Sequence, residues 1–163
     1  MPKILILTMV LLIGAGCATT YQKANYTGGY SETRLSENVW IVYFKGNGST
    51  SLEKTIDFSL LRSAELALEN GFNFFALTDS TLDINTGAYA TPTHAYTTGP
   101  AFGFRNSGVF QGNTQYYSGQ TITIKKPSTS NTVIMFKEKP ENARVVFSAE
   151  FVIQSIKGKY NLK

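Results

Sequence analysis

VWIVYF, residues 39–44, is the strongest strand signal in the chain, because every one of its residues is β-branched or aromatic. A strand that is apolar on both alternating faces is expected to lie centrally in a sheet and to be covered on both sides. A second run of this kind, FNFFAL at residues 72–77, follows a predicted helix. Strand, helix and strand in close succession predict either a βαβ-like crossover or a helix packed on a sheet.

The segment between these strands carries the best helix signal, over about residues 51–70. At 100° per residue its apolar side chains fall on one broad face and its charged side chains in a narrow wedge opposite. The predicted apolar face is Leu52, Ile56, Leu60, Ala64, Ala67 and Leu68, and the predicted solvent wedge is Lys54, Arg62, Glu65 and Glu69. Thr50 with Glu53 fits a capping box, and Arg62 with Glu65 fits a surface ion pair.

The C-terminal part predicts a hairpin followed by a second helix. Residues 121–125 alternate like a strand, PSTSN at 127–131 is typical of a turn, and 133–136 is a further strand. Ser148 fits an N-cap, and Phe151, Val152, Ile153 and Ile156 form a helical stripe. The sequence therefore predicts an α+β fold, a small mixed sheet with one long amphipathic helix at about 51–70 and a C-terminal helix at about 148–158.

Residues 81–118 have a different composition from the rest of the chain. They are rich in threonine, glycine and aromatic residues, and Asp83 and Arg105 are their charged residues. The segment is either a mobile loop or a long β-hairpin, because it has no clear period but its threonines and tyrosines suit strands. Aromatic faces among neutral hydrogen-bonding groups suit glycans or partner proteins. The candidate binding surface is Tyr89, Tyr96, Phe102, Phe104, Tyr116 and Tyr117.

The N-terminus predicts export. Lys3 precedes an apolar run at residues 4–13, and small residues then lead to Cys17, which is the one cysteine of the chain. This pattern predicts a signal peptide at residues 1–16, and the apolar run is too short to span a bilayer. Residues 17–29, which are polar and have no period, are expected to form a lipidated N-terminus and tether. Residues 30–163 are expected to form one domain.

Cys17 and the small residues before it resemble the lipobox of bacterial lipoproteins. The resemblance implies that Cys17 is lipidated and anchors the protein to a membrane, although Gly14 stands where a lipobox usually has Leu, Val or Ile. Ordinary signal-peptidase cleavage near Cys17 is the alternative. In Gram-negative lipoproteins, an aspartate after the cysteine commonly retains the protein at the inner membrane. Ala18 at that position therefore implies transport to the outer membrane, with the protein facing the periplasm.

Composition and motifs argue against several kinds of chemistry. The formal net charge of +4 is small, so no nucleic-acid partner is expected. His94 is the one histidine and Cys17 the one cysteine, which makes a metal site or a His-based catalytic site unexpected. Gly46-Asn47-Gly48 lacks the lysine and the glycine spacing of a phosphate-binding loop and predicts a tight turn. No cofactor and no enzymatic activity are expected.

Several segments resemble a family of small, uncharacterised proteobacterial envelope lipoproteins. The resemblance rests on five segments: GYS at residues 29–31, EN at 37–38, FKGNG at 44–48, LLRSAE at 60–65 and GFNFF at 71–75. It implies the strand–helix–strand core and an envelope location, but it implies no activity. The expected function is a membrane-anchored, non-catalytic structural or assembly component of the envelope. The alternative is a periplasmic module that binds glycan or peptidoglycan through residues 81–118.

Overall fold

The computed structural model describes residues 18–104, 107–110, 112–141, 143 and 145–163. The chain divides into two compact units, one reaching to Asn85 and resuming at Lys125–Lys163, the other formed by Thr86–Ile124. The sequence predicts a single domain with an excursion at 81–118, whereas the structure assigns the second unit to Thr86–Ile124. We call the second unit the ribbon.

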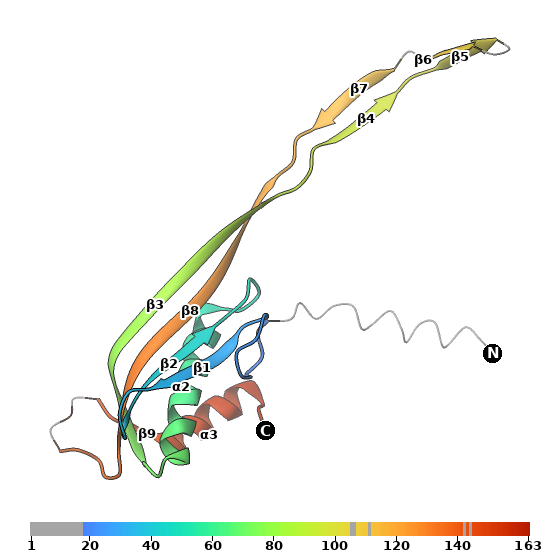
Figure 1. The fold of residues 1–163 in the computed structure, drawn as a ribbon. Helices are drawn as coiled ribbons and strands as arrows, with labels where there is room; N and C mark the ends of the chain where they lie inside the picture. Colours follow the sequence, from blue (N-terminus) through green and yellow to red (C-terminus); the bar gives the residue numbers. More distant parts are fainter. Residues whose placement is uncertain (1–17, 105–106, 111, 142, 144) are drawn as a thin grey trace, which may run out of the picture. The chain divides into compact units, whose positions relative to one another are not determined.

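The first unit is built on a five-stranded sheet with the order β1-β2-β8-β3-β9 (Figure 1). Its strands are β1 (Gly29–Arg34), β2 (Val39–Lys45), β8 (Thr121–Phe136), β3 (Phe74–Ala90) and β9 (Phe147–Ser148), of which β3 and β8 continue into the ribbon. The strands pair in antiparallel fashion. The predicted α+β class is confirmed.

The sheet differs from the predicted mixed one because β8 lies between β2 and β3. The helix α2 (Leu52–Glu69) connects β2 to β3, which run in the same direction but are not neighbours. The connection is therefore a split β-α-β unit, in which a strand from late in the chain fills the gap.

Both helices pack on the same face of the sheet, and the core lies between them and the strands. The helix α3 (Ala149–Tyr160) starts after Ser148, whose side chain accepts a hydrogen bond from the amide of Phe151, so the predicted N-cap is confirmed. Phe151 itself is exposed, in contrast to its place in the predicted stripe. The fully buried core includes Val42, Phe44, Phe58, Leu61, Phe75, Val133 and Met135. β2 lies between β1 and β8, as the prediction of a central strand requires. Its cover is less complete than expected, because only Val42 and Phe44 are fully buried and Val39, Ile41 and Tyr43 on the other face are partly buried.

The segment PSTSN is not a turn but part of β8. Alternate residues from Pro127 to Met135 are buried, and Lys45 of β2 pairs with Ser128 at the start of this stretch. Turn-forming residues adopt strand geometry here because β2 provides a full ladder of partners, which overrides local propensity. The amide of Gly46 donates to the carbonyl oxygen of Pro127 at 2.8 Å.

The buried face of α2 is only partly the predicted one. Ala64 and Ala67 are buried and Leu60 is partly buried, as predicted, but Leu52, Ile56 and Leu68 are exposed. The buried residues of the helix also include the polar Thr55, Ser59, Arg62 and Ser63. The small hydroxyl side chains let the helix approach β8, where the Asn131 amide donates to Ser59 Oγ and Asn131 Oδ1 accepts from Ser80 Oγ at 2.7 Å. Hydrogen bonds satisfy the buried hydroxyl and amide groups of Thr55, Ser59, Ser63 and Asn131, so a polar strip can form part of the core.

The start of α2 also differs from the predicted capping box. Ser51 is the N-cap, and its hydroxyl accepts from the Lys54 amide at 3.2 Å. Thr50 is buried and binds the N-terminal segment instead, accepting from the amide of Thr19 at 2.9 Å.

Residues 18–29 do not form a tether but pack on the first unit. Thr19 is buried, and Tyr21 packs against Tyr30 and Phe58 with ring centroids 5.0 and 5.3 Å away. Gly28 and Gly29 have φ angles of 109° and 124°, and a side chain at Gly28 would place Cβ 2.3 Å from the carbonyl oxygen of Lys45. The glycine pair therefore lets the segment lie close to β2.

The ribbon consists of paired strands, so the hairpin alternative for residues 81–118 is the one found. β4 (His94–Thr98) pairs with β7 (Asn113–Tyr117), and β5 (Ala101–Phe104) pairs with β6 (Ser107–Phe110), both in antiparallel fashion. Close to β3 and β8, the amide of Thr91 donates to the carbonyl oxygen of Gln120 at 2.9 Å.

Candidate functional site

The ribbon carries all six residues that the sequence singles out for binding. Tyr89, Tyr96, Tyr116 and Tyr117 are all exposed. Tyr89 lies in β3, Tyr96 in β4, and Tyr116 and Tyr117 in β7. Phe102 and Phe104 lie in β5, where their backbones pair with Val109 and Ser107.

The pairing register distributes these tyrosines over both faces of the ribbon. Tyr96 pairs with Gln115 and His94 with Tyr117, and the rings of Tyr96 and Tyr117 meet edge to face with centroids 5.9 Å apart. Tyr116 directly precedes Tyr117 in β7 and has the opposite orientation, because successive side chains of a strand point to opposite faces. The six candidate residues therefore do not form one continuous surface.

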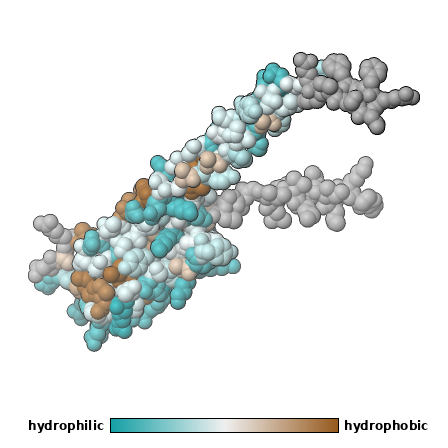
Figure 2. Space-filling view, turned by 45° about the horizontal axis from the view of Figure 1, so that its top comes forward, coloured by the Kyte–Doolittle hydropathy of each residue, from teal (hydrophilic) through white to brown (hydrophobic). Residues whose placement is uncertain are grey.

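The ribbon has open edges and few charges. β4 with β7 and β5 with β6 are two-stranded sheets, so within the described residues the outer edge of each of these strands has no strand partner. Arg105 is the one residue of Thr86–Ile124 with a formal charge, and His94 is exposed in β4. On the face shown in Figure 2 the ribbon is mostly white to teal, that is, of intermediate to hydrophilic character. Such a surface suits neutral polar or aromatic contacts better than ionic ones.

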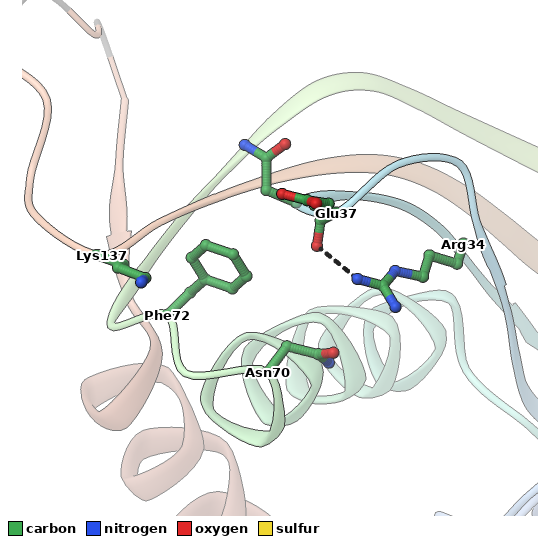
Figure 3. A pocket seen from close by; sticks show the side chains of 6 residues that line it. Arg34, Glu37, Asn70, Phe72 and Lys137 are labelled. Carbon is green, nitrogen blue, oxygen red and sulfur yellow. Dashed lines mark hydrogen bonds between the residues drawn. The ribbon is translucent and has the colours of Figure 1, made fainter.

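A hollow of about 420 Å³ lies where the β1–β2 turn approaches the end of α2 (Figure 3). Arg34 and Lys137 supply positive charge to it, and Phe72 supplies an aromatic wall. The Arg34 guanidinium is already bound, because it donates to the carbonyl oxygens of Ser36 and Glu37 at 3.0 and 3.2 Å. Arg34 therefore stabilises the turn, and the hollow has the character of a surface depression.

A charged cluster surrounds Arg62, which is 8% exposed despite its predicted place in the solvent wedge. Its guanidinium contacts Glu32 at 3.1 Å, Glu69 at 2.8 Å and Glu65 at 3.6 Å. Lys157 of α3 contacts Glu65 at 3.1 Å. The predicted Arg62–Glu65 pair thus exists as part of a partly buried network that ties β1, α2 and α3 together.

Tyr21 joins this cluster from the N-terminal segment, and its hydroxyl donates to Glu65. Burial, together with the hydrogen bond to the Glu65 carboxylate, raises the pKa of Tyr21 well above its ordinary value. Burial lowers the pKa of Arg62, but the hydrogen bonds to Glu69 and Glu32 outweigh it and the pKa is raised. The Tyr21 phenol is therefore neutral and the Arg62 guanidinium charged, and their hydrogen bonds join the N-terminal segment, β1 and α2.

The loop Gly46-Asn47-Gly48 receives the N-terminal segment. Asn47 donates its amide to Thr19 Oγ1 at 3.0 Å, and Thr19 Oγ1 donates to the carbonyl oxygen of Thr27 at 2.9 Å. A side chain at Gly46 would place Cβ 2.8 Å from Cβ of Thr50, which explains the glycine at the start of the loop. The tight turn predicted here thus serves to fix residues 18–28.

Cys17, the predicted lipidation site, lies outside the described residues. Among the residues that are described, no cluster of three or more His, Cys, Asp or Glu side chains is placed to hold a metal ion. In the same part of the chain, no helix is both long enough and apolar enough to cross a membrane. Comparison with known proteins gave no match to a family model, a curated sequence or a solved structure.

Proposed function

We propose that this protein is a lipid-anchored, non-catalytic component of the cell envelope that assembles with a partner protein through the ribbon. The observation that carries the proposal is the combination of open strand edges and near absence of charge in Thr86–Ile124. The anchor would be a lipid on Cys17, with the protein facing the periplasm from the outer membrane. The signal-peptide pattern and the lipobox resemblance support this location.

The physical argument concerns strand edges. An isolated two-stranded ribbon is only marginally stable in water, and exposed edges with few charges readily accept another strand. Soluble proteins usually protect such edges with lysines, prolines or bulges. The ribbon instead presents Tyr96 and Tyr116 among Thr, Gln and Asn, a composition that suits protein interfaces. A partner that adds a strand would gain backbone hydrogen bonds along the edge and aromatic contacts on the faces.

Photo-cross-linking in living cells tests this proposal. A photoreactive phenylalanine analogue replaces Tyr96 or Tyr116 in the ribbon, and Phe151 on α3 in a control, since all three side chains are exposed. Discrete cross-linked adducts at the two ribbon positions, and none at Phe151, are the expected result. Equal labelling at all three positions, or no adduct from the ribbon, would refute assembly through the ribbon.

Glycan binding is the second candidate, and the Tyr96–Tyr117 pair favours it. These rings lie on one face of the ribbon, beside the amide side chain of Gln115, whose Oε1 accepts from the Tyr117 hydroxyl at 3.2 Å. Aromatic faces next to amide groups suit sugar rings. Co-sedimentation with purified peptidoglycan sacculi tests this candidate, with Tyr117→Ala expected to lower the bound fraction. Tyr116→Ala, on the opposite face, is the matched control and is expected to bind normally.

A further inference from the structure

Hydrogen bonds fix Thr19, the second residue after Cys17, to the start of α2 and to the Asn25–Gly28 segment. Thr19 is 2% exposed, and its amide and hydroxyl bind Thr50 and Thr27, both at 2.9 Å. Ala18 is the one residue between Cys17 and Thr19. Two residues span at most about 7 Å, so the Cα of Cys17, whose side chain would carry the lipid, cannot be farther than roughly that distance from the Cα of Thr19.

A second set of hydrogen bonds forms a tight turn at Asn25–Gly28. The amides of Asn25 and Gly28 each donate to the other residue's carbonyl oxygen at 3.1 Å, and Asn25 Oδ1 accepts from the Thr27 amide at 2.8 Å. Tyr26 lies at the tip of this turn and is 99% exposed. A completely exposed tyrosine on a rigid turn is unusual, because tyrosine is normally at least partly buried.

The surface around this turn is basic. Lys23 and Lys45 are exposed beside it, with Lys23 bridged to Tyr30 and Lys45 paired with Gly29. Lys45 and Lys126 both line a hollow of about 280 Å³. Residues 18–28 and 45–50 contain no carboxylate. We call these two segments the anchor-side surface.

We propose that the anchor-side surface lies directly on the membrane that carries the lipid, with the Tyr26 ring in the interfacial layer and the lysines at anionic phospholipid headgroups. This inference rests on the proposed lipidation of Cys17. The short chain between the lipid and Thr19 leaves no room for the first unit to stand away from the bilayer. Tyrosine favours the membrane interface, and lysines close to the membrane surface are attracted to anionic lipid.

The orientation of the first unit follows from the strand register. Gly29 and Lys45 lie at one end of the β1–β2 pair, and Arg34 and Trp40 lie at the other end. The anchor-side surface is at the Lys45 end, so Trp40 is expected to face away from the bilayer. Ser148, which precedes α3, is also at the far end, because it pairs with Phe74 at the beginning of β3.

Fluorescence quenching by lipids with brominated acyl chains tests the inference on the intact lipoprotein. The protein is purified from membranes and reconstituted into vesicles of phosphatidylcholine and phosphatidylglycerol. Trp40 is the one tryptophan of the chain and serves as an internal reference, so Tyr26→Trp adds a single new emitter. A matched control, Phe151→Trp, adds an exposed tryptophan on α3.

The Tyr26→Trp emission is expected to be blue-shifted and strongly quenched, whereas the emission of the unsubstituted protein and of Phe151→Trp is expected to change little. Mass spectrometry of the N-terminal peptide is carried out on the same samples. A lipidated, vesicle-bound protein whose Tyr26→Trp emission is not quenched would overturn the inference and leave the proposed anchor standing. Absence of lipid on Cys17 would overturn both.

Discussion

Replacing Arg62 tests the largest difference between the sequence prediction and the structure. Arg62→Met keeps much of the buried stem and removes the charge that faces Glu32, Glu65 and Glu69. Removing one partner of a fully buried pair costs about 3–5 kcal/mol, because the remaining charge is left uncompensated. The side chains of Glu32 and Glu65 keep 20% and 18% exposure, so we expect a loss of about 2–4 kcal/mol.

The assay is urea unfolding of the Cys17→Ser variant, which cannot carry a lipid at that position, followed by circular dichroism. Glu69→Gln is the control, because the Glu69 side chain is 53% exposed and its pair should contribute under about 1 kcal/mol. The double variant Arg62→Met with Glu32→Met is expected to lose less than Arg62→Met alone, since no unpaired charge remains at that contact. A loss for Arg62→Met no larger than for Glu69→Gln would return Arg62 to the surface and refute the burial argument.

Three further outcomes are expected. Gly28→Ala should lower the free energy of unfolding in urea by about 1–3 kcal/mol, because Gly28 has a φ of 109° and the new Cβ would clash with the carbonyl oxygen of Lys45. An unchanged unfolding midpoint would contradict this. The folded-state pKa of Tyr21 is raised, so the stability that it contributes is present below about pH 10 and is lost as the pH rises above that value. The melting temperature of the unsubstituted protein should therefore fall between about pH 9 and 11, and that of Tyr21→Phe should fall less. An equal fall in both proteins would refute this. Replacing Thr86–Ile124 by a short Gly-Ser linker should change the free energy of unfolding by under about 1 kcal/mol, whereas loss of the cooperative transition would make the ribbon part of the core.

The sequence predicts the elements of the first unit well where a strong local signal agrees with the packing. The strand at 39–44 lies within β2, the helix at about 51–70 is α2, and Ser148 is the N-cap of α3. These signals are local, since β-branched runs and capping hydroxyls act within a few residues.

The errors occur where contacts distant in sequence decide the outcome. The helical wheel of α2 places apolar and charged residues and leaves its hydroxyl residues unassigned, but Ser59 is buried and meets Asn131, a residue that is 72 positions away. The polar segment after Cys17 is held to the rest of the first unit by hydrogen bonds such as that from Thr19 to Thr50. Hydrogen bonds of this kind need no periodic apolar residues. A hydrophobic pattern cannot reveal either contact.

The candidate surface was found only in part. The composition of residues 81–118 points to the tyrosines, which are exposed in the ribbon. The division of Tyr96 and Tyr116 between two faces depends on the pairing register, which the irregular pattern of this segment does not specify. Tyr26 was missed because a single tyrosine in a polar segment carries no distinctive signal, although the glycine pair after it indicates a tight turn.

The insertion of β8 between β2 and β3 has a consequence for folding during synthesis. The side chain of Asn38 binds the carbonyl oxygen of Met135, 97 positions later, and β3 also lacks its neighbour until β8 is made. Nascent chains that end before β8 therefore cannot complete the sheet, and pairings this distant in sequence form slowly. The first unit therefore cannot reach its native fold until most of the chain, up to the end of β8, has been synthesised.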